Sequence, residues 1–349
     1  MRTMLILAAV VFQLLVLGWM AADRELVAST GRRVWLRTAP VDPRDPFRGD
    51  YVRLNYGFNR LPVELFRDGI RDWPKTVEWR ARKSFNDRRV YVRLEEAPGG
   101  VMRAVAVSDR RPPEKDALWL RGRVASFDGN SLEVRYGLEA YFVEEGQGLK
   151  LENAAWRGGG DDIQTPLLVE AAVRASDGSA LIRQVKPSPL GIGLTQVRGK
   201  KDRRLTGVTL KLRNSSDEPL AVAELPGLGA WTLAEAAPPS SWGRQQERDR
   251  WHWAGRPAGV PPPVTARDLR VLKPGEVVKY EVDLRDPAWD VVNGKGGRKS
   301  ITELDNDWVN RFRFVYRAPE SAALQGLPNA ALVWQGELAT RAFWNGGVD

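Results

Sequence analysis

Apolar residues recur at every second position in most segments of the chain after residue 30. In the stretch DYVRLNY, residues 50–56, the side chains of Val52, Leu54 and Tyr56 fall on one face and their polar neighbours on the other. Successive side chains of a β-strand point to opposite faces, so this alternation is typical of half-buried strands. The segments RVYVRLE, GVTLKLRN, RFRFVYR and ALVWQGEL follow the same rule. The sequence therefore predicts a mainly β protein.

Chain length and turn signals favour two β domains over one. A chain of 349 residues exceeds the usual size of a single domain. We expect a first β domain over residues 25–191, a basic linker over residues 192–206 and a second β domain over residues 207–349. Several short strands separated by turns favour an immunoglobulin-like β-sandwich for the second domain. A proline-rich insertion at about residues 236–263 lies outside its sheets, because proline lacks the donor that a central strand needs.

Three local patterns predict individual elements. The triplet Asp-Gly-Asn at residues 128–130 predicts the turn of a β-hairpin. The pair Pro-Gly at residues 274–275 predicts a second hairpin. The spacing of Leu61, Leu65 and Ile70 predicts a short helix in the segment LPVELFRDGIRDWP.

An uncharged apolar run from Thr3 to Ala22, broken only by Gln13, lies near the amino terminus. About 20 such residues in a helix can cross the roughly 30 Å hydrocarbon core of a membrane, which predicts an anchor over residues 1–24. Arg2 precedes the run, which favours an inner-membrane protein with its amino terminus in the cytoplasm and its bulk in the periplasm. A cleaved signal peptide is the alternative, although its apolar region is usually shorter, about 7–15 residues.

Cysteine and histidine usage excludes several kinds of site. The chain has no cysteine, and its single histidine is His252. Disulfides, thiolate catalysis, the usual zinc sites and a conventional Ser-His-Asp triad therefore lack the residues that they need. The formal net charge of +9 favours anionic surroundings such as a lipid surface, but arginines spread along the whole chain are also typical of an ordinary solvated surface. We expect no cofactor, no metal and no nucleic-acid partner.

Charged residues of both signs crowd the segment that leads into the strand at residues 50–56. They can bind one another through charge-assisted hydrogen bonds that fix a proline-rich loop. They can also bind an anionic ligand through Arg44, Arg48 and Arg53. The candidate binding residues are Asp42, Arg44, Asp45, Arg48, Asp50, Tyr51, Arg53 and Asn55.

The octapeptide GDYVRLNY, residues 49–56, resembles the signature of the GDYXXLXY protein family. The matching positions are Gly49, Asp50, Tyr51, Leu54 and Tyr56. The upstream segment PVDPRDPFR and the downstream segment EAYFVEEGQGLKLE, residues 139–152, are similar to the flanking patterns of that family, with Glu144 where a proline is expected. The resemblance covers about residues 27–190 and implies a membrane-anchored bacterial protein of unassigned function. It brings no catalytic residues to carry over.

A second candidate surface lies in the proline-rich insertion, where tryptophans and arginines alternate. Indole rings suit a lipid interface or a glycan, and guanidinium groups pair with phosphate or carboxylate. The alternative is a long loop that its tryptophans fold back onto its own domain. The candidate residues are Trp242, Arg244, Arg248, Arg250, Trp251 and Trp253.

These features together favour a membrane-anchored periplasmic module that binds or scaffolds a membrane or periplasmic protein partner in an envelope complex. The sequence contains no common nucleophile, phosphate-loop or metalloprotease motif, which favours a protein that is not an enzyme. Two alternatives stay open. One is an envelope hydrolase that pairs Asp50 with a glutamate among Glu144, Glu145 and Glu152. The other is a binder of anionic lipid or glycan through the second candidate surface.

Overall fold

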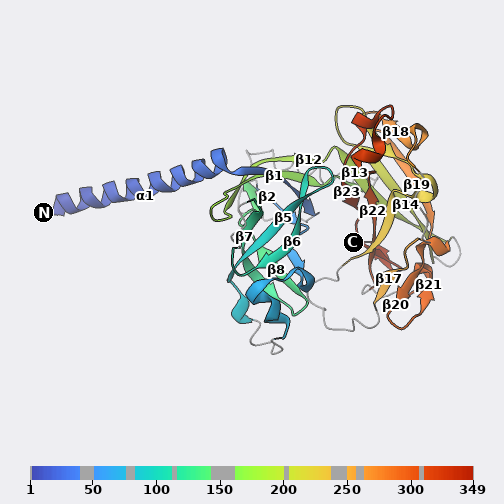
Figure 1. Ribbon diagram of the computed structural model, residues 1–349, viewed down its shortest axis with the longest axis horizontal. Coiled ribbons are helices and arrows are strands. Elements are labelled where there is room, and N and C mark those ends of the chain that lie inside the picture. Colours follow the sequence, from blue (N-terminus) through green and yellow to red (C-terminus); the bar gives the residue numbers. More distant parts are fainter. Residues whose placement is uncertain are drawn as a thin grey trace. The chain divides into compact units, whose positions relative to one another are not determined.

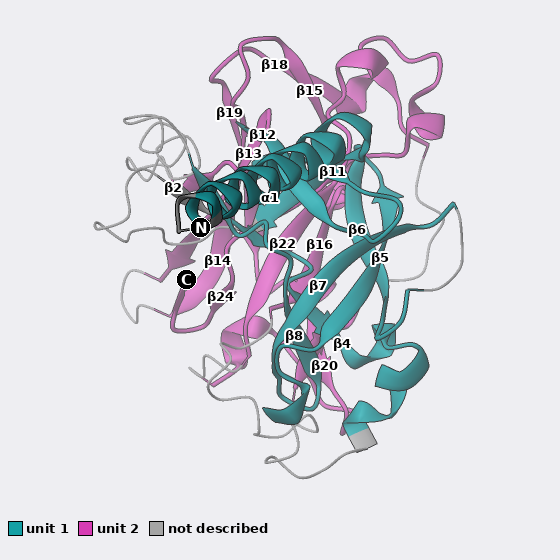
Figure 2. Ribbon diagram, turned by 90° about the vertical axis from the view of Figure 1, so that its left-hand side faces the viewer, with its two compact units in different colours: residues 1–148, 167–186 teal, residues 149–166, 187–349 magenta. Residues whose placement is uncertain are grey.

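The computed structural model describes residues 2–39, 51–75, 83–111, 116–142, 162–199, 204–236, 250–256, 263–305 and 310–348. In these residues the chain is mainly β, as the alternating pattern predicts (Figure 1). The chain divides into two compact units, which are described one at a time (Figure 2). Unit 1 holds Met1–Gly148 and Leu167–Lys186, and unit 2 holds Leu149–Pro166 and Pro187–Asp349.

The amino-terminal helix α1, Arg2–Thr30, is long and apolar enough to span a membrane. Its apolar side chains from Ile6 to Met20 are exposed to the surroundings of the protein. Exposed apolar side chains are what a helix in contact with lipid presents. The backbone N–H of Gly31 donates to the carbonyl of Val27 at 3.0 Å, and strand β1, Arg32–Ala39, begins at the next residue. The first strand of unit 1 therefore follows the helix after a single residue, without an intervening linker (Figure 1).

The last turns of α1 pack on strand β11, Leu167–Val173. Val27 is buried there, and the guanidinium of Arg174 donates to the carboxylate of Asp23 at 2.6 Å. Arg183 donates to the carbonyl of Ala28. These contacts hold the end of the helix in a defined direction relative to the sheet of unit 1.

One curled sheet forms most of unit 1, in the strand order β12-β11-β1-β6-β5-β7-β8-β4, and β3 pairs with β1. Its strands besides β1 and β11 are β3 (Asn55–Tyr56), β4 (Arg60–Pro62), β5 (Arg89–Ala97), β6 (Val101–Ser108), β7 (Leu118–Phe127), β8 (Ser131–Arg135) and β12 (Ala180–Pro187). A separate pair consists of β2 (Tyr51–Arg53) and β9 (Ala140–Phe142). Short 3-10 turns are η1 (Val63–Leu65), η2 (Asp68–Lys75) and η3 (Lys83–Phe85).

The core of unit 1 confirms the period-two reading of its strands. β7 and β8 form the predicted hairpin around residues 128–130, and Val124 lies opposite Val134. The strand expected at residues 50–56 forms as two short strands, β2 and β3, and we call these two strands and Leu54 between them the signature strand. Leu54 and Tyr56 are each only 2% exposed, as expected for its core face. The apolar side chains at alternate positions of the hairpin and of the residue after it are buried, namely Leu118, Leu120, Val124, Leu132, Val134 and Tyr136.

The short helix predicted around Leu61, Leu65 and Ile70 is confirmed only in part, because the segment forms two 3-10 helices, Val63–Leu65 and Asp68–Lys75, and no α-helix. Leu61 lies in β4 instead, where it pairs with Leu132 of β8. The chain then forms the 3-10 helices η1 and η2, with Phe66 and Arg67 between them. The first residue of η2 is Asp68, whose φ of 51° lies in the left-handed region and cannot continue a right-handed helix from η1. The first turn of the expected helix is thus a strand, because Leu61 pairs with a residue far along the chain.

Unit 2 contains several smaller sheets, with the orders β10-β13-β14-β19, β15-β18, β16-β22-β24-β25 and β17-β20-β21, while β23 pairs with β22. The strands of the first two sheets are β10 (Ile163–Gln164), β13 (Leu190–Arg198), β14 (Leu205–Asn214), β15 (Leu220–Ala223), β18 (Leu269–Leu272) and β19 (Val277–Asp283). The others are β16 (Trp231–Glu235), β17 (Trp251–Trp253), β20 (Val291–Asn293), β21 (Arg298–Lys299), β22 (Phe312–Arg317), β23 (Glu337–Ala339), β24 (Phe343–Trp344) and β25 (Gly347–Val348). The 3-10 turns are η4 (Pro226–Leu228), η7 (Ala266–Asp268), η8 (Pro287–Trp289), η9 (Ile301–Glu303), η10 (Ser321–Leu324) and η11 (Ala330–Leu332). The immunoglobulin-like arrangement of this unit stays a prediction.

Four segments of unit 2 differ from the pattern expected from the sequence. The insertion expected to lie outside the sheets contributes β17, Trp251–Trp253, which pairs with β20. The segment ALVWQGEL, residues 331–338, begins in η11 and becomes a strand only at Glu337, where β23 starts. The basic stretch at residues 192–206 lies largely in β13 and β14, which pair with each other. The hairpin predicted at residues 274–275 is wrong, because β18 pairs with β15 and β19 pairs with β14. The buried side chain of Asn214 donates to the carbonyl of Leu272 at 3.0 Å, and its backbone bonds to residues of the turn. The chain therefore crosses from one sheet to another at this turn.

Candidate functional site

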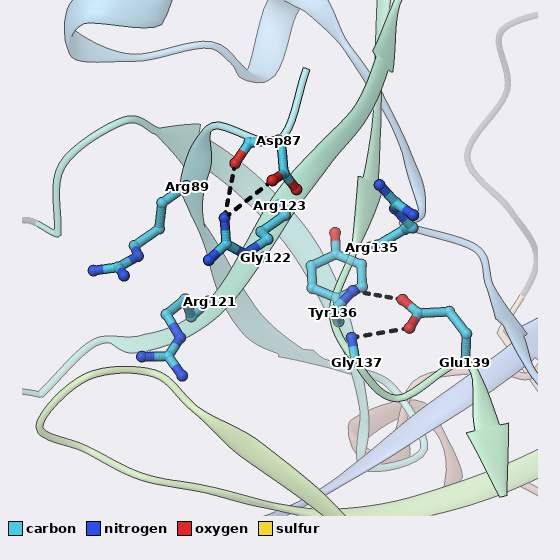
Figure 3. A pocket seen from close by; sticks show the side chains of 9 residues that line it. All are labelled: Asp87, Arg89, Arg121, Gly122, Arg123, Arg135, Tyr136, Gly137 and Glu139. Atoms are coloured by element: carbon cyan, nitrogen blue, oxygen red, sulfur yellow. Dashed lines mark hydrogen bonds and ion pairs between the residues drawn. The ribbon is translucent and has the colours of Figure 1, made fainter. Parts of the chain in front are cut away.

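A pocket of about 470 Å³ lies in unit 1, lined by residues of β5, β7 and β8 and of the segments beside them. Valines at alternate positions of these strands point into the core, so the arginines between them point outward. Among the residues that the structure describes, the lining includes four arginines and two acids (Figure 3). They are Arg89, Arg121, Arg123, Arg135, Asp87 and Glu139.

Three of the arginines form a row across adjacent strands. Arg89 of β5 pairs in register with Arg123 of β7, and Arg123 pairs in register with Arg135 of β8. Residues directly opposite each other in antiparallel strands have their side chains on the same face, about 5 Å apart at Cβ. Like charges in such positions destabilise a sheet by a few tenths of a kcal/mol to about 1 kcal/mol. We call Arg89, Arg123 and Arg135 the arginine row.

Acidic side chains pair with only two of the four arginines that line the pocket. Arg123 lies 3.5 Å from the carboxylate of Asp87, in a pair whose side chains are both more than half exposed. Arg121, next to the row on β7, donates to the carboxylate of Asp177 at 2.7 Å. Arg89 and Arg135 have no hydrogen-bond or ion-pair partner in the part of the chain that the structure describes. Two guanidinium groups at the ends of the row are therefore available to a ligand.

Close backbone packing forms the wall beside the row. A Cβ atom on Gly122 would lie 2.3 Å from a methyl group of Val134, so only glycine fits where β7 approaches β8. The Glu139 carboxylate accepts hydrogen bonds from the backbone N–H groups of Tyr136 and Gly137, the second at 2.9 Å (Figure 3). The Tyr136 hydroxyl donates to the carbonyl of Phe58 at 2.7 Å. Burial, followed by the charge of Glu139, raises the pKa of Tyr136 well above its usual value and keeps the phenol neutral.

The signature strand holds this wall in place. The backbone N–H of Leu54 donates to the carbonyl of Glu139 at 2.8 Å. Next to this bond, β2, which ends before Leu54, pairs with β9, which begins after Glu139. The Tyr56 hydroxyl donates to the carbonyl of Leu138 at 2.7 Å. Burial and the charge of Glu139 raise the pKa of Tyr56 as well, so its phenol stays a donor at physiological pH. The described parts of the two sequence patterns, residues 51–56 and 139–142, thus meet at the edge of the pocket.

The turn between β11 and β12 connects the pocket to the end of α1. Asp177 accepts hydrogen bonds from the backbone N–H and the hydroxyl of Ser179 at 3.0 and 2.7 Å. Burial raises the pKa of the Asp177 carboxyl, but the bonds from Ser179 and the charges of Arg121 and Arg174 lower it by more. The net pKa therefore lies below that of a free aspartate.

Replacing Asp177 by asparagine should remove a contribution to stability that depends on pH. Since the folded pKa lies below the unfolded pKa, the carboxylate stabilises the fold above the unfolded pKa, and this contribution disappears as the pH falls through the folded value. We expect Asp177→Asn to reduce the free energy of unfolding by about 1 kcal/mol at pH 7 and by less at pH 3. Urea titrations of both proteins at the two pH values measure the difference. An equal loss at both pH values would contradict a role for the charge.

The first candidate surface lies mostly outside the described residues. Asp42, Arg44, Asp45, Arg48 and Asp50 all fall there, so their role stays a prediction. Tyr51 and Arg53 lie in β2, where the structure gives their backbone pairing to Phe142 and Ala140. Asn55 lies in β3 with an exposed side chain, opposite Ala39.

The second candidate surface is described only in part. Trp242, Arg244 and Arg248 fall outside the described residues, whereas Arg250, Trp251 and Trp253 fall inside them. Trp251 and Trp253 are partly buried against the core of unit 2. The Trp253 indole donates to the carbonyl of Ala288 at 3.0 Å and stacks on Trp289 at 5.9 Å between ring centroids. In this part of the insertion the tryptophans thus pack on their own unit, while binding by the whole segment stays a prediction.

The residues needed for the hydrolase alternative also fall outside the described residues, namely Asp50, Glu144, Glu145 and Glu152. The described residues contain no group of three or more His, Cys, Asp or Glu side chains that could hold a metal ion. His252 lies beside the carboxylate of Glu235 at the exposed edge of unit 2.

The arginine row is a site that the sequence reasoning missed. Its signal was present, since arginine takes polar positions of the segments RVYVRLE, LRGRVAS and EVRYG. Alternation alone places each arginine on the outer face of its own strand. The register that aligns them depends on an irregularity between Val124 and Ser126 of β7, which no local pattern indicates.

Comparison with known proteins identifies a family to which the chain is similar. The model of a family described as GDYXXLXY protein matches residues 13–185. This range includes α1 from residue 13 onward, the signature strand and every residue that lines the pocket. No curated protein and no solved structure matches the chain.

Proposed function

Because the model of the GDYXXLXY protein family matches residues 13–185 and the same segment carries the arginine row, we propose that the protein is a membrane-anchored binding or scaffolding module of the cell envelope. In this proposal, α1 anchors the chain and unit 1 presents its pocket to an anionic group of a partner. The observation that carries it is the pair of guanidinium groups, Arg89 and Arg135, that flank Arg123 without a partner among the described residues.

The electrostatic repulsion within the arginine row supports a binding role over a purely structural role. Three aligned arginines weaken the sheet that holds them, since each faces a like charge on the next strand. The exposed pair between Arg123 and Asp87 offsets little of this, because such pairs are worth about 0–1 kcal/mol. An anionic partner would offset the repulsion and gain charge-assisted hydrogen bonds. Asp42, Arg44 and the other residues of the first candidate surface remain part of the proposed interface.

Crosslinking in the native membrane tests the module. Tagged wild type is crosslinked in cells and the isolated proteins are identified by mass spectrometry, in parallel with an Arg89→Gln/Arg135→Gln protein. We expect a membrane or periplasmic protein to be recovered with wild type and to fall several-fold with the double variant. The matched control is Arg103→Gln/Arg110→Gln, which removes the same charge from exposed positions outside the pocket. Equal recovery with both double variants would contradict the proposal.

We also propose that the chain beyond α1 lies in the periplasm. Because the chain has no cysteine, a single introduced thiol reports topology without background. We expect a membrane-impermeant maleimide to label Asp217→Cys, at an exposed turn of unit 2, in cells with a permeable outer membrane, and to label Arg2→Cys only after lysis. Labelling in the reverse order would place the bulk of the chain in the cytoplasm. Arg24, Arg32 and Arg33 would favour that outcome under the positive-inside rule.

A further inference from the structure

The charges of the pocket do not cancel. Of the four arginines in its lining, Arg121 pairs with Asp177 and Arg123 pairs with Asp87. Arg89 and Arg135 have no partner among the described residues, so two positive charges stay without an acid. Both oxygens of Glu139 already accept backbone hydrogen bonds, so this acid does not pair with the row (Figure 3). A ligand with a single negative charge would leave part of the excess uncompensated. A group with two negative charges would balance it.

The spacing of the row sets the shape of that group. Neighbouring strands lie about 4.8 Å apart, so the backbones at Arg89 and Arg135 are separated by about 10 Å, with Arg123 between them. Arginine side chains can reach inward over this distance to one central group. A phosphate offers three or more acceptor oxygens in different directions, whereas one planar carboxylate matches a single guanidinium fork.

The volume of the pocket exceeds the need of a bare phosphate. At about 470 Å³ it falls in the range of pockets for small organic ligands, roughly 300–1,000 Å³. The carboxylate of Asp87 lies beside the row and can accept a hydroxyl or amine donor from the remainder of such a ligand.

We propose that the arginine row binds a doubly charged phosphate group, a phosphomonoester or a diphosphate, carried by a larger molecule. This inference rests on the proposed function, because it names the anionic group that the binding module recognises. Arg89 and Arg135 grip the group from two sides, and Arg123 turns from Asp87 to contact it. A membrane lipid headgroup and a soluble phosphorylated molecule share this chemistry.

Thermal unfolding of the full-length protein in an uncharged detergent provides the test. Pyrophosphate and inorganic phosphate are compared with sodium chloride and acetate at equal ionic strength. We expect the two phosphates to raise the melting temperature of wild type and of Arg103→Gln/Arg110→Gln. We expect the dissociation constant for pyrophosphate to rise about tenfold or more with either Arg89→Gln or Arg135→Gln.

The unliganded variants provide a check against misfolding. Relief of the like charges in the row should leave the melting temperature of Arg89→Gln/Arg135→Gln equal to wild type or higher, although it no longer responds to phosphate. A double variant that melts lower and still responds to phosphate would overturn the inference. So would a wild type that responds equally to phosphate, acetate and chloride.

Reconstitution in nanodiscs separates the two sources of the group. Wild type is compared in discs of phosphatidylcholine alone and in discs that also contain a lipid phosphomonoester. A rise in melting temperature that Arg89→Gln/Arg135→Gln lacks would assign the site to a lipid headgroup. A response to soluble pyrophosphate alone would assign it to a soluble ligand.

The outcome also separates this inference from the proposed function. If crosslinked recovery of a partner depends on Arg89 and Arg135 but no phosphate probe binds, the module stands and the phosphate assignment fails. If phosphate binds but recovery does not depend on the two arginines, the scaffold reading fails and the site is that of a small ligand. If neither depends on them, both proposals fail.

Discussion

Replacing Tyr56 by alanine is expected to destabilise unit 1 by about 3–5 kcal/mol, the usual loss for removing a buried aromatic side chain. Tyr56 is 2% exposed and stacks on Phe58 with 5.5 Å between ring centroids. Its hydroxyl bonds to the carbonyl of Leu138, so the substitution leaves both a cavity and an unpaired carbonyl beside the pocket. Because a domain is typically stable by only about 5–15 kcal/mol, this loss would remove a substantial part of the free energy of unfolding of unit 1.

Tyr56→Phe separates the hydrogen bond from the packing. It keeps the ring and removes only the donor to Leu138, so we expect a loss of about 1 kcal/mol. Asn55→Ala is the matched control, since this neighbour is exposed and its loss should lie within about 0.5 kcal/mol. Urea unfolding followed by circular dichroism measures all three. A Tyr56→Ala loss no larger than that of Asn55→Ala would show that the signature tyrosine does not support the fold.

If the wall of the pocket depends on this tyrosine, Tyr56→Phe should also weaken the response to pyrophosphate without touching an arginine. The backbone from Leu138 to Glu139 is held from one side by the Tyr56 hydroxyl and by the N–H of Leu54. A looser wall would change the position of Arg135 only indirectly, through β8. We therefore expect a smaller effect on the dissociation constant than that of either arginine substitution.

Local alternation was enough to predict several strands of unit 1 and the side chains that they bury. The hairpin of β7 and β8 needs only two alternating segments and a turn signal, all of which lie within 18 residues of sequence, 118–135. Burial of Leu54 and Tyr56 follows in the same way from the period of two. These features are determined by neighbours along the chain.

Features that depend on distant partners could not be predicted in this way. Leu61 fits a helix by spacing, yet it lies in a strand because Leu132 provides a partner for it. A turn does form at residues 274–275, as Pro-Gly predicts. The strands on either side of it, β18 and β19, do not pair with each other, because β18 pairs with β15 and β19 pairs with β14. The candidate site also depends on distant partners. The exposure of each arginine can be predicted from the alternation, but the alignment of the arginines requires the register of three strands.

Replacing Trp231 by alanine is expected to produce the other large loss, about 3–5 kcal/mol, in unit 2. Trp231 is 1% exposed and belongs to the main core cluster of that unit. It contacts Tyr316 and Tyr280 edge to face, at 5.3 and 5.6 Å between ring centroids. Each such aromatic pair stabilises the fold by about 0.5–1.5 kcal/mol beyond the effect of the area that it buries. The alanine variant loses two of these pairs together with the packing of the indole ring.

Trp231→Phe distinguishes aromatic packing from the indole N–H. The indole nitrogen is buried without a hydrogen-bond partner in the part of the chain that the structure describes, so phenylalanine removes volume but no bond. We expect a loss well below that of Trp231→Ala.

Hydrogen exchange measured by mass spectrometry locates the effect of Trp231→Ala. Since the core cluster around Trp231 lies within unit 2, protection should fall in β16, β22 and the strands beside them. Protection should persist in β5, β7 and β8, and so should the response to pyrophosphate. Loss of protection in both units would instead mean that they unfold as one. In that case the arginine row could not be assigned to a binding module that folds independently of unit 2.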